Sequence, residues 1–484
     1  MPPSGYLTAT GIEACLQYLA TTYPAICSLI LMPETSIEGR TIRAIKVASG
    51  SGADRHGVIL IGGVHSEELV NPDLLVSFAL KLCRAYTSGS GLTFGPKTYD
   101  PSTVQLLVNH LDILILPLVN PDGRMYVQSP GGDEWWRKNR NPNPGQPCMG
   151  VDINRNYDFL WSSGIGTSAS SCSLNFKGSG AFSEPETRNV RHMLDTYANI
   201  ECFADVHSYE QLILHPWGDD DNQTTDPSMN FQNPIYDGLR GTPGDSVYKE
   251  YIPPGDLSWY VSTATFMRDA IAAVRGRVYT IEQGVLLYPT SGTSRDFTYS
   301  RHFVDGTKRR VYTYTIETGT EFQPVYAEAL NIISEVSAGL VELLLACLCV
   351  VEETITGTAL VEEIDDMRAF RDRDMVRTAV GRRYVQLLNE NGAEAMQLLR
   401  SERRRSQAVD LLERVQRVVR TRHNPKPEGF LPDLLRSIAA TLRDVQGQAS
   451  EQLRRAIQEV IDDLGHFEER TVMEGLEAAS KARS

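Results

Sequence analysis

The sequence lacks the features that mark two broad classes of protein. Its 47 Lys and Arg residues are outnumbered by 61 Asp and Glu, which gives a formal net charge of −14. Because binding to a phosphate backbone needs a basic surface, we expect no nucleic-acid partner. No apolar run approaches the roughly 20 residues that span a bilayer. The most apolar stretch, 340–351, is shorter and contains Glu342, so we expect no membrane partner either.

Targeting signals and an evident disulfide framework are also missing. The first five residues, Met-Pro-Pro-Ser-Gly, contain neither the basic region nor the apolar core of a signal peptide. The chain as written is therefore expected in the cytoplasm, and it would be secreted if a leader preceded it. Eight cysteines in 484 residues suggest no obvious set of disulfides.

The first part of the chain alternates strand and helix patterns. Residues 11–23 have helical apolar spacing, 41–47 alternate as in a half-buried strand, and 58–61 and 111–116 are apolar strands. This order predicts an α/β domain over 1–345, with a mixed, largely parallel twisted sheet and helices on both faces. Ligand sites in such sheets lie beyond the carboxyl ends of the strands.

From about residue 350 the composition changes. Pro and Gly become rare, Arg, Glu, Gln and Leu increase, and apolar residues recur on helical faces. The three faces contain Leu412, Val415 and Val419; Leu431, Leu435, Ile438 and Leu442; and Leu453, Ile457, Val460 and Leu464. We therefore predict an α-helical region over 350–484, forming a coiled coil or bundle, that mediates oligomerisation or partner binding.

A candidate metal site follows the strand at 58–61. Two glycines end this strand, and His65 and Glu68 come next, three residues apart. A catalytic zinc ion usually takes three protein ligands and leaves one position for water. His207, which ends the apolar segment 203–206, is the candidate third ligand. Taken alone, the spacing H-x-x-E is a weak signal, because a surface His and Glu often occur this way by chance.

Further motifs occur in a fixed order along the chain. They are Asn120-Pro121-Asp122-Gly123, Trp136-Arg137-Lys138-Asn139-Arg140, Val151-Asp152-Ile153-Asn154-Arg155, His207-Ser208-Tyr209, Tyr288-Pro289-Thr290-Ser291-Gly292, and Thr315-Ile316-Glu317-Thr318-Gly319. Together with the His65 motif, this order resembles the zinc metallocarboxypeptidases of the pancreatic carboxypeptidase A and B type. The resemblance spans roughly residues 5 to 345.

The resemblance implies one Zn²⁺ per chain, held by His65, Glu68 and His207. The metal would lower the pKa of a bound water and polarise the scissile carbonyl. Glu317 would be the general base that moves the proton of the water to the leaving amine. Arg137 would stabilise the developing oxyanion. The similar segment 279–282 precedes the Tyr288 loop, so the carboxylate in it is not the base.

Five residues are implied in substrate binding. Asn154 and Arg155 would hold the terminal carboxylate, Tyr288 would close over the substrate from a mobile loop, and Tyr209 would line the site. Arg295 takes the position that forms the floor of the specificity pocket in the family. A buried guanidinium needs an anionic partner, which predicts a preference for C-terminal Glu or Asp.

Four residues complicate these expectations. Asp205 precedes His207 by two residues, and if it pairs with Arg295 the pocket becomes neutral. Glu67 replaces an arginine that pancreatic members carry, which leaves contacts upstream of the scissile bond open. Cys148 and Cys172 match a disulfide of pancreatic members, so either the pair is reduced or the chain is secreted.

The function implied is that of a hydrolase: a zinc-dependent protease that removes single residues from peptide or protein C-termini. Two alternatives remain open. One is a catalytically impaired carboxypeptidase-like binding module, but the metal ligands and Glu317 are all present. The other is an N-acyl amino acid deacylase, but the Asn154-Arg155 and Tyr288 motifs favour peptides.

Overall fold

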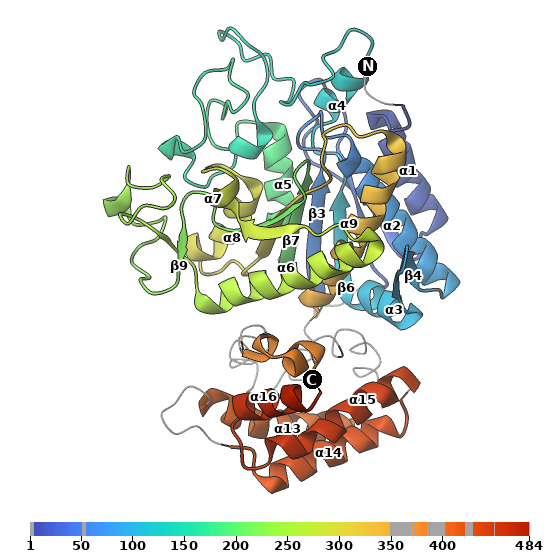
Figure 1. Ribbon diagram of the computed structural model, residues 1–484. Coiled ribbons are helices and arrows are strands. Elements are labelled where there is room, and N and C mark those ends of the chain that lie inside the picture. Colours follow the sequence, from blue (N-terminus) through green and yellow to red (C-terminus); the bar gives the residue numbers. More distant parts are fainter. Residues whose placement is uncertain are drawn as a thin grey trace. The chain divides into compact units, whose positions relative to one another are not determined.

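The computed structural model of the protein (Figure 1) describes residues 4–50, 55–348, 370, 374–384, 387, 402–421, 429–449 and 451–483. The chain divides into two compact units. One comprises Met1–Pro253 and Ala264–Cys347, and the other comprises Pro254–Thr263 and Leu348–Ser484. The sequence predicts two domains, 1–345 and 350–484, and this division into domains remains a prediction.

An eight-stranded sheet forms the centre of the first unit. Its order is β1-β2-β6-β3-β7-β12-β8-β11. The strand bounds are β1 Cys27–Leu31, β2 Arg43–Val47, β3 His56–Gly62, β6 Leu111–Leu116, β7 Ile200–His207, β8 Leu212–His215, β11 Thr280–Gln283 and β12 Tyr312–Glu317. Two short pairs lie outside this sheet, β4 Leu92–Phe94 with β5 Lys97–Tyr99 and β9 Asn222–Gln223 with β10 Glu250–Tyr251.

The sheet is mixed, as predicted. The central strands β6, β3, β7 and β12 are parallel to one another, whereas β1, β2 and β8 pair antiparallel with their inner neighbours. In β3, the side chains from Val58 to Ile61 are fully buried. A strand covered on both faces reads as a continuous apolar run, which is why this one was visible in the sequence.

Helices cover both faces of the sheet. Figure 1 shows β3, β6 and β7 between helices α1, α2 and α9 on one side and α5 and α8 on the other. The helix bounds are α1 Ala9–Thr22, α2 Val70–Ser88, α3 Pro101–His110, α4 Pro121–Gln128, α5 Pro185–Thr196, α6 Pro254–Arg275, α7 Gly284–Leu287, α8 Ser294–Val304 and α9 Tyr326–Cys347.

Helix α9 corrects the expectation about apolar runs. Among the described residues it is the one helix long and apolar enough to cross a membrane, and 78% of its apolar window is buried inside the protein. The helix begins at Tyr326, well before Leu340, so its apolar stretch is longer than expected. Its packing against α2 and the sheet accounts for its composition.

The second unit contains the predicted helices. They are α13 Glu402–Thr421, α14 Pro432–Gln446, α15 Glu451–Asp463 and α16 Val472–Ala482. Val419 and Leu435 are buried in a shared apolar cluster, as their spacing predicts. The prediction for Leu431 was wrong: it precedes α14 and is 68% exposed, and Leu434 takes the buried position. Part of the predicted region, including 349–369 and 388–401, lies outside the described residues.

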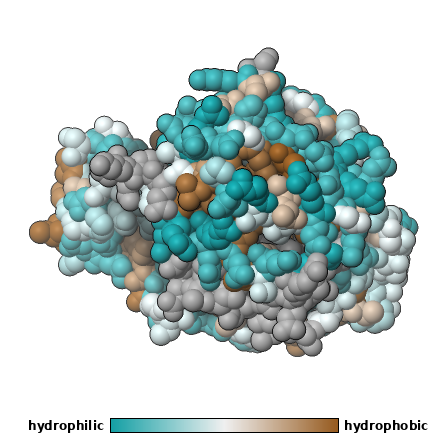
Figure 2. Space-filling view, turned by 90° about the horizontal axis from the view of Figure 1, so that it is seen from below, coloured by the Kyte–Doolittle hydropathy of each residue, from teal (hydrophilic) through white to brown (hydrophobic). Residues whose placement is uncertain are grey.

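The surface visible from below is mainly hydrophilic (Figure 2). Its apolar areas are interrupted by hydrophilic side chains. Scattered exposed apolar residues are normal on soluble proteins, whereas a broad contiguous patch indicates an interaction site.

The expectation of no disulfide framework was wrong. Cys148 and Cys172 form a disulfide with a sulfur–sulfur distance of 2.04 Å, which answers the question left open by the sequence. A second disulfide joins Cys202 in β7 to Cys347 at the end of α9, across a sequence separation of 145 residues. The last helix of the first unit is thereby tied to a central strand.

Candidate metal centre

Three adjacent parallel strands bring the candidate site together. Strands β3, β7 and β12 end at the same edge of the sheet, where Gly62 pairs with Val206 and Glu317 pairs with His207. His65 follows the end of β3 by three residues. The residues predicted from separate motifs therefore meet beyond the carboxyl ends of neighbouring strands, where ligand sites of such sheets lie.

The turn that leaves β3 requires glycine at position 63. Gly63 has φ +62°, a left-handed conformation, and an added Cβ would lie 2.8 Å from Leu118 and 2.9 Å from Pro72. Any side chain here would be both strained and crowded. This glycine lets the chain turn directly from the buried strand into the loop that carries His65 and Glu68.

His65, Glu68 and His207 converge on one point. One ligand atom from each lies within 4.8 Å of the others, and all three side chains are buried. His65 Nδ1 is 2.6 Å from Glu68 Oε1, and His207 Nδ1 is 3.1 Å from Glu68 Oε2. Within the described ranges this is the one group of three or more His, Cys, Asp or Glu side chains placed to hold a metal ion.

The far side of each imidazole is held by a carboxylate. His65 Nε2 lies 3.2 Å from Asp152 Oδ1, and His207 Nε2 lies 3.0 Å from Asp205 Oδ2. Such partners keep the proton on Nε2, so that each Nδ1 presents a lone pair. The two Nδ1 atoms are only 3.1 Å apart.

Two lone pairs and a carboxylate at this distance repel one another unless a cation lies among them. Burial alone would lower the pKa of His207, but Asp205 and Glu68 raise it well above its ordinary range. The buried nitrogen and oxygen atoms therefore favour a bound positive charge. Two imidazoles and a carboxylate are a donor set that suits zinc, so the residues present fit a zinc ion.

Glu68 is held by neighbours that are not themselves predicted metal ligands. Its Oε2 accepts hydrogen bonds from the Ser208 backbone at 2.9 Å and from Asn71 Nδ2 at 3.2 Å. Thr318 Oγ1 in turn donates to Asn71 Oδ1 at 3.0 Å. Burial opposes ionisation of Glu68, but His65 and His207 outweigh it and lower its pKa. Asn71 follows Glu68 by three residues and lies in the first turn of α2, whereas Glu68 lies in the loop before this helix.

Glu317 lies at the end of β12, beside His207. Burial raises the pKa of Glu317 to about 7; His207 acts against this shift and Glu68 adds to it. A zinc ion would lower this pKa through its positive charge. Glu282 is on β11, and β8 separates that strand from β12. The sheet order thus agrees with the choice of Glu317 over Glu282.

Arg137 is surrounded by carboxylates. Its Nε donates to Asp152 Oδ2 at 3.2 Å, and its Nη1 lies 3.7 Å from Glu67 and 3.8 Å from Glu68. Asp152 therefore positions both a predicted ligand, His65, and this arginine. Asp152 belongs to a motif of the sequence, but its role appears only in the fold.

Four of the five predicted substrate-binding residues have the following contacts and exposures. Asn154 Oδ1 accepts a hydrogen bond from the Ser294 backbone at 2.9 Å. Arg155 donates through Nη1 to the Asn154 carbonyl at 2.7 Å, and its guanidinium carbon is 5.7 Å from the centre of the Tyr288 ring. Tyr288 is 46% exposed. Tyr209, 37% exposed, packs edge-on against Phe322, with 4.7 Å between ring centres.

Arg295 has an anionic partner, but not the one considered from the sequence. Its Nε and Nη2 each donate to one oxygen of Asp296 at 3.0 Å. Asp205 is occupied by His207 and by the Ser294 hydroxyl at 2.6 Å. Gly284 makes room for the guanidinium, because a Cβ there would overlap it. Arg295 is therefore buried and already paired.

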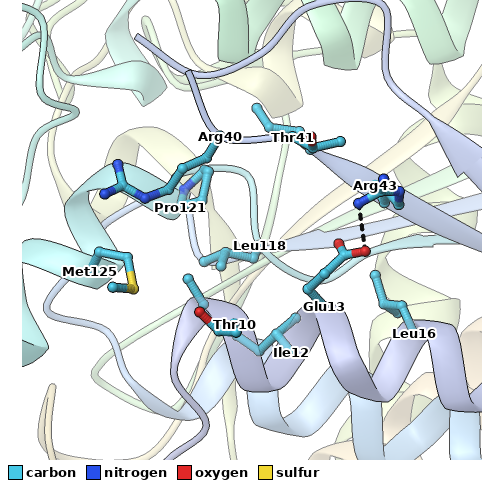
Figure 3. Close-up of a pocket in the computed structure, with 12 residues that line it drawn as sticks. Thr10, Ile12, Glu13, Leu16, Arg40, Thr41, Arg43, Leu118, Pro121 and Met125 are labelled. Carbon is cyan, nitrogen blue, oxygen red and sulfur yellow. Dashed lines mark hydrogen bonds and ion pairs between the residues drawn. The ribbon is translucent and has the colours of Figure 1, made fainter. Parts of the chain in front are cut away.

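A hollow of about 300 Å³ lies elsewhere on this unit (Figure 3). Helix α1 supplies Ile12, Glu13 and Leu16 to its lining, the segment before β2 supplies Arg40, and β2 itself supplies Arg43. None of the predicted site residues lines it. Arg43 pairs with Glu13 at 2.5 Å, and Arg40 pairs with Asp122 at 2.6 Å. Its cations already have partners, so this hollow is not the candidate site.

The fold and the convergent donors together define a metal centre on an α/β sheet, and comparison with known proteins agrees. The family model "Zinc carboxypeptidase" matches residues 12–337. Carboxypeptidase B of Helicoverpa zea is 35% identical over 226 residues, which cover 46% of this chain and 48% of that protein. Carboxypeptidase B of Astacus astacus is 32% identical over 309 residues, which cover 63% of this chain and 84% of that protein.

The fold is also similar to that of solved carboxypeptidases. Bovine thrombin-activatable fibrinolysis inhibitor, in complex with tick carboxypeptidase inhibitor, gives a TM-score of 0.55 at 22% identity, covering 71% of this chain and 97% of that chain. The chain spans about half the length of the Helicoverpa zea relative. On the extent of the family match, this chain belongs to the zinc carboxypeptidase family.

Proposed function

We propose that the protein is a zinc-dependent exopeptidase that removes single residues from the C-termini of peptides or proteins. One observation carries the proposal: His65, Glu68 and His207 converge beside Glu317, on the ends of three adjacent strands. Bound zinc would lower the pKa of a water and polarise the scissile carbonyl.

The chain supplies the remaining chemistry. Glu317, beside the donors, would accept the proton of the attacking water and deliver it to the leaving amine. Arg137, whose carboxylate partners fix its position, would face the oxyanion. Asn154 and Arg155 would hold the terminal carboxylate, and the exposed Tyr288 ring, near the Arg155 guanidinium, would cover it. A clamp of this kind limits hydrolysis to the last peptide bond.

We further propose a preference for C-terminal Glu over Asp, and for both over neutral residues. Support comes from the buried Arg295 guanidinium at the predicted pocket floor. The Asp296 pair neutralises this charge in the free protein and occupies Nε and Nη2. Within the described chain Nη1 has no hydrogen-bond partner, so a substrate carboxylate would bind there, end-on. The preference should accordingly be moderate, since a second bidentate pair is not available.

A residue scan tests both parts of the proposal. N-terminally blocked peptides that differ only in a last residue of Glu, Asp, Phe or Lys are incubated with the zinc-loaded chain, and products are identified by mass. The expected product lacks one C-terminal residue, and Glu317→Gln is the matched control. Release of the N-terminal acyl group would favour the deacylase, and binding without hydrolysis would favour the impaired module.

We also propose that the protein works in an oxidising compartment and that residues 350–484 contact a partner or a second copy. The two disulfides favour secretion over the cytoplasm, since reducing compartments disfavour structural disulfides.

The proposal that residues 350–484 contact a partner or a second copy rests on the amphipathic helices in this region. Cutting the chain near residue 350 should keep peptidase activity and abolish any self-association seen by light scattering. A soluble but inactive product would contradict this division of roles.

A further inference from the structure

Two further cysteines lie against each other in the interior of the first unit. Cys27 is the first residue of the edge strand β1, and Cys83 is in α2. Both side chains are buried, at 5% and 0% exposure, and their sulfur atoms are 3.0 Å apart. A disulfide bond is about 2.05 Å long. Closing the gap therefore requires a movement of only about 1 Å.

The surroundings of this pair offer no competing role. A metal site would need further His, Cys or carboxylate ligands, and the one such group among the described residues is that of His65, Glu68 and His207. Contact with the Cys83 thiol lowers the pKa of Cys27. This shift belongs to the folded contact, so the case for a bond rests on the distance between the two sulfur atoms.

We propose that Cys27 and Cys83 form a third disulfide, which joins the edge strand β1 to helix α2. The conditions that produce the Cys148–Cys172 and Cys202–Cys347 bonds would produce this one as well. This proposal is independent of the proposed peptidase activity, because it depends on the two thiols alone.

The chemistry is a thiol–disulfide exchange with an external disulfide, such as oxidised glutathione or a disulfide oxidase. The Cys27 thiolate attacks the oxidant, forms a mixed disulfide and releases one reduced thiol. Cys83 then loses its proton, attacks the Cys27 sulfur and releases the second thiol. Two protons and two electrons leave the protein, and the oxidant gains both. Because the pair is buried, the exchange takes place before folding is complete.

The bond would anchor the helix that supports the candidate site. Helix α2 begins directly after the metal loop, and Asn71 on its first turn donates to Glu68. Asp73 on the same turn accepts from the Leu7 backbone and from Arg124. A cross-link from α2 to β1 removes conformational freedom from the unfolded chain over the intervening residues. We expect it to raise the resistance of the first unit to unfolding.

Peptide mapping gives the direct test. The full chain is refolded in a glutathione redox buffer, or produced by secretion, then denatured without reductant, alkylated and digested. A linked Cys27–Cys83 peptide should appear, and alkylation should label Cys15 but neither Cys27 nor Cys83. Alkylated Cys27 and Cys83 in a sample that contains the Cys148–Cys172 bond would overturn the proposal.

A stability measurement complements the map. The Tm of the oxidised protein and of the protein after reduction is compared for the wild type, a Cys27→Ala/Cys83→Ala variant and the control Cys15→Ser. Reduction should lower the Tm of the wild type and of the control by several degrees more than that of the double variant. An equal loss in all three chains would contradict the third bond. The map remains decisive if the double variant does not fold.

Discussion

Asp205 Oδ2 lies 3.0 Å from His207 Nε2, so the orientation of a candidate zinc ligand is fixed from the same strand, two residues earlier. Side chains at i and i+2 of a strand point to the same face. The carboxylate holds the Nε2 proton and leaves Nδ1 free to bind metal, a second contact that tunes the ligand. The carboxylate considered from the sequence as a pocket charge is thus a positioning group.

Replacing Asp205 should weaken zinc binding without removing a ligand. Asp205→Ala leaves the His207 ring unheld, and loss of such partners typically costs 10- to 100-fold in metal affinity. The measurement is the zinc Kd by chelator competition, with His207→Ala as the reference that loses most of the metal. An unchanged Kd in a folded Asp205→Ala chain would contradict the positioning role.

Glu317→Gln should separate metal binding from catalysis. The amide keeps the size of the side chain but cannot accept a proton, so kcat should fall at least about 100-fold, as is typical of losing a general base. Zinc content and the affinity for an uncleaved product should be retained. The controls are metal analysis and Glu282→Gln, a change on β11, which β8 separates from β12, that should leave kcat close to that of the wild type.

Arg295→Ile should alter which residue is removed and leave the reaction itself intact. Loss of the guanidinium takes away the anion-binding group of the proposed pocket, so kcat/KM for peptides ending in Glu should fall relative to those ending in Phe. The ratio of the two kcat/KM values is the measurement. A wild type that cleaves Phe or Lys peptides equally well, or a variant that still prefers Glu, would refute the pocket argument.

The burial of two acidic side chains predicts how the stability of the fold depends on pH. Burial raises the pKa of Glu250 from 4.5 to about 7, and burial with the neighbouring Glu250 raises that of Asp219. Between pH 4.5 and about pH 7 the unfolded chain has lost the Glu250 proton and the folded chain keeps it, so the free energy of unfolding falls as pH rises. The slope is about 1.4 kcal/mol per pH unit.

The matched variant is Glu250→Gln, which cannot titrate. The Tm of the wild type should fall more than that of the variant between pH 5 and pH 7.5, and the two curves should run parallel above that range. Parallel curves over the whole range would show that Glu250 titrates at its ordinary pKa in the folded protein.

The features that could be predicted from the sequence were those that depend on local residue patterns. The run from Val58 to Ile61 predicted β3, and the motif order predicted that His65, Glu68 and His207 would meet, as the sheet register explains. Local patterns cannot show partners made by folding. The contact of Asp152 with both His65 and Arg137 joins residues far apart in the chain and only appears once the strands are in register.

Other errors have equally physical causes. The Cys202–Cys347 bond joins residues 145 positions apart, and no spacing rule links two cysteines at such a separation. Leu431 fitted a helical repeat, but the helix begins one residue later, at Pro432, because proline suits the first position of a helix. The pairing of Arg295 with the adjacent Asp296 depends on room left by Gly284, which the sequence alone does not place nearby.

The central claim is that this chain removes one residue from a free C-terminus at the His65–Glu68–His207 centre. The most direct measurement uses two peptides of one sequence, one ending in a free Glu carboxylate and the other in the amide, followed by mass spectrometry. The zinc-loaded wild type should release a single Glu from the free acid, should leave the amide nearly intact, and should lose this activity with a chelator or in Glu317→Gln. Equal cleavage of both peptides, cleavage at an internal bond, or full activity in Glu317→Gln would contradict the account.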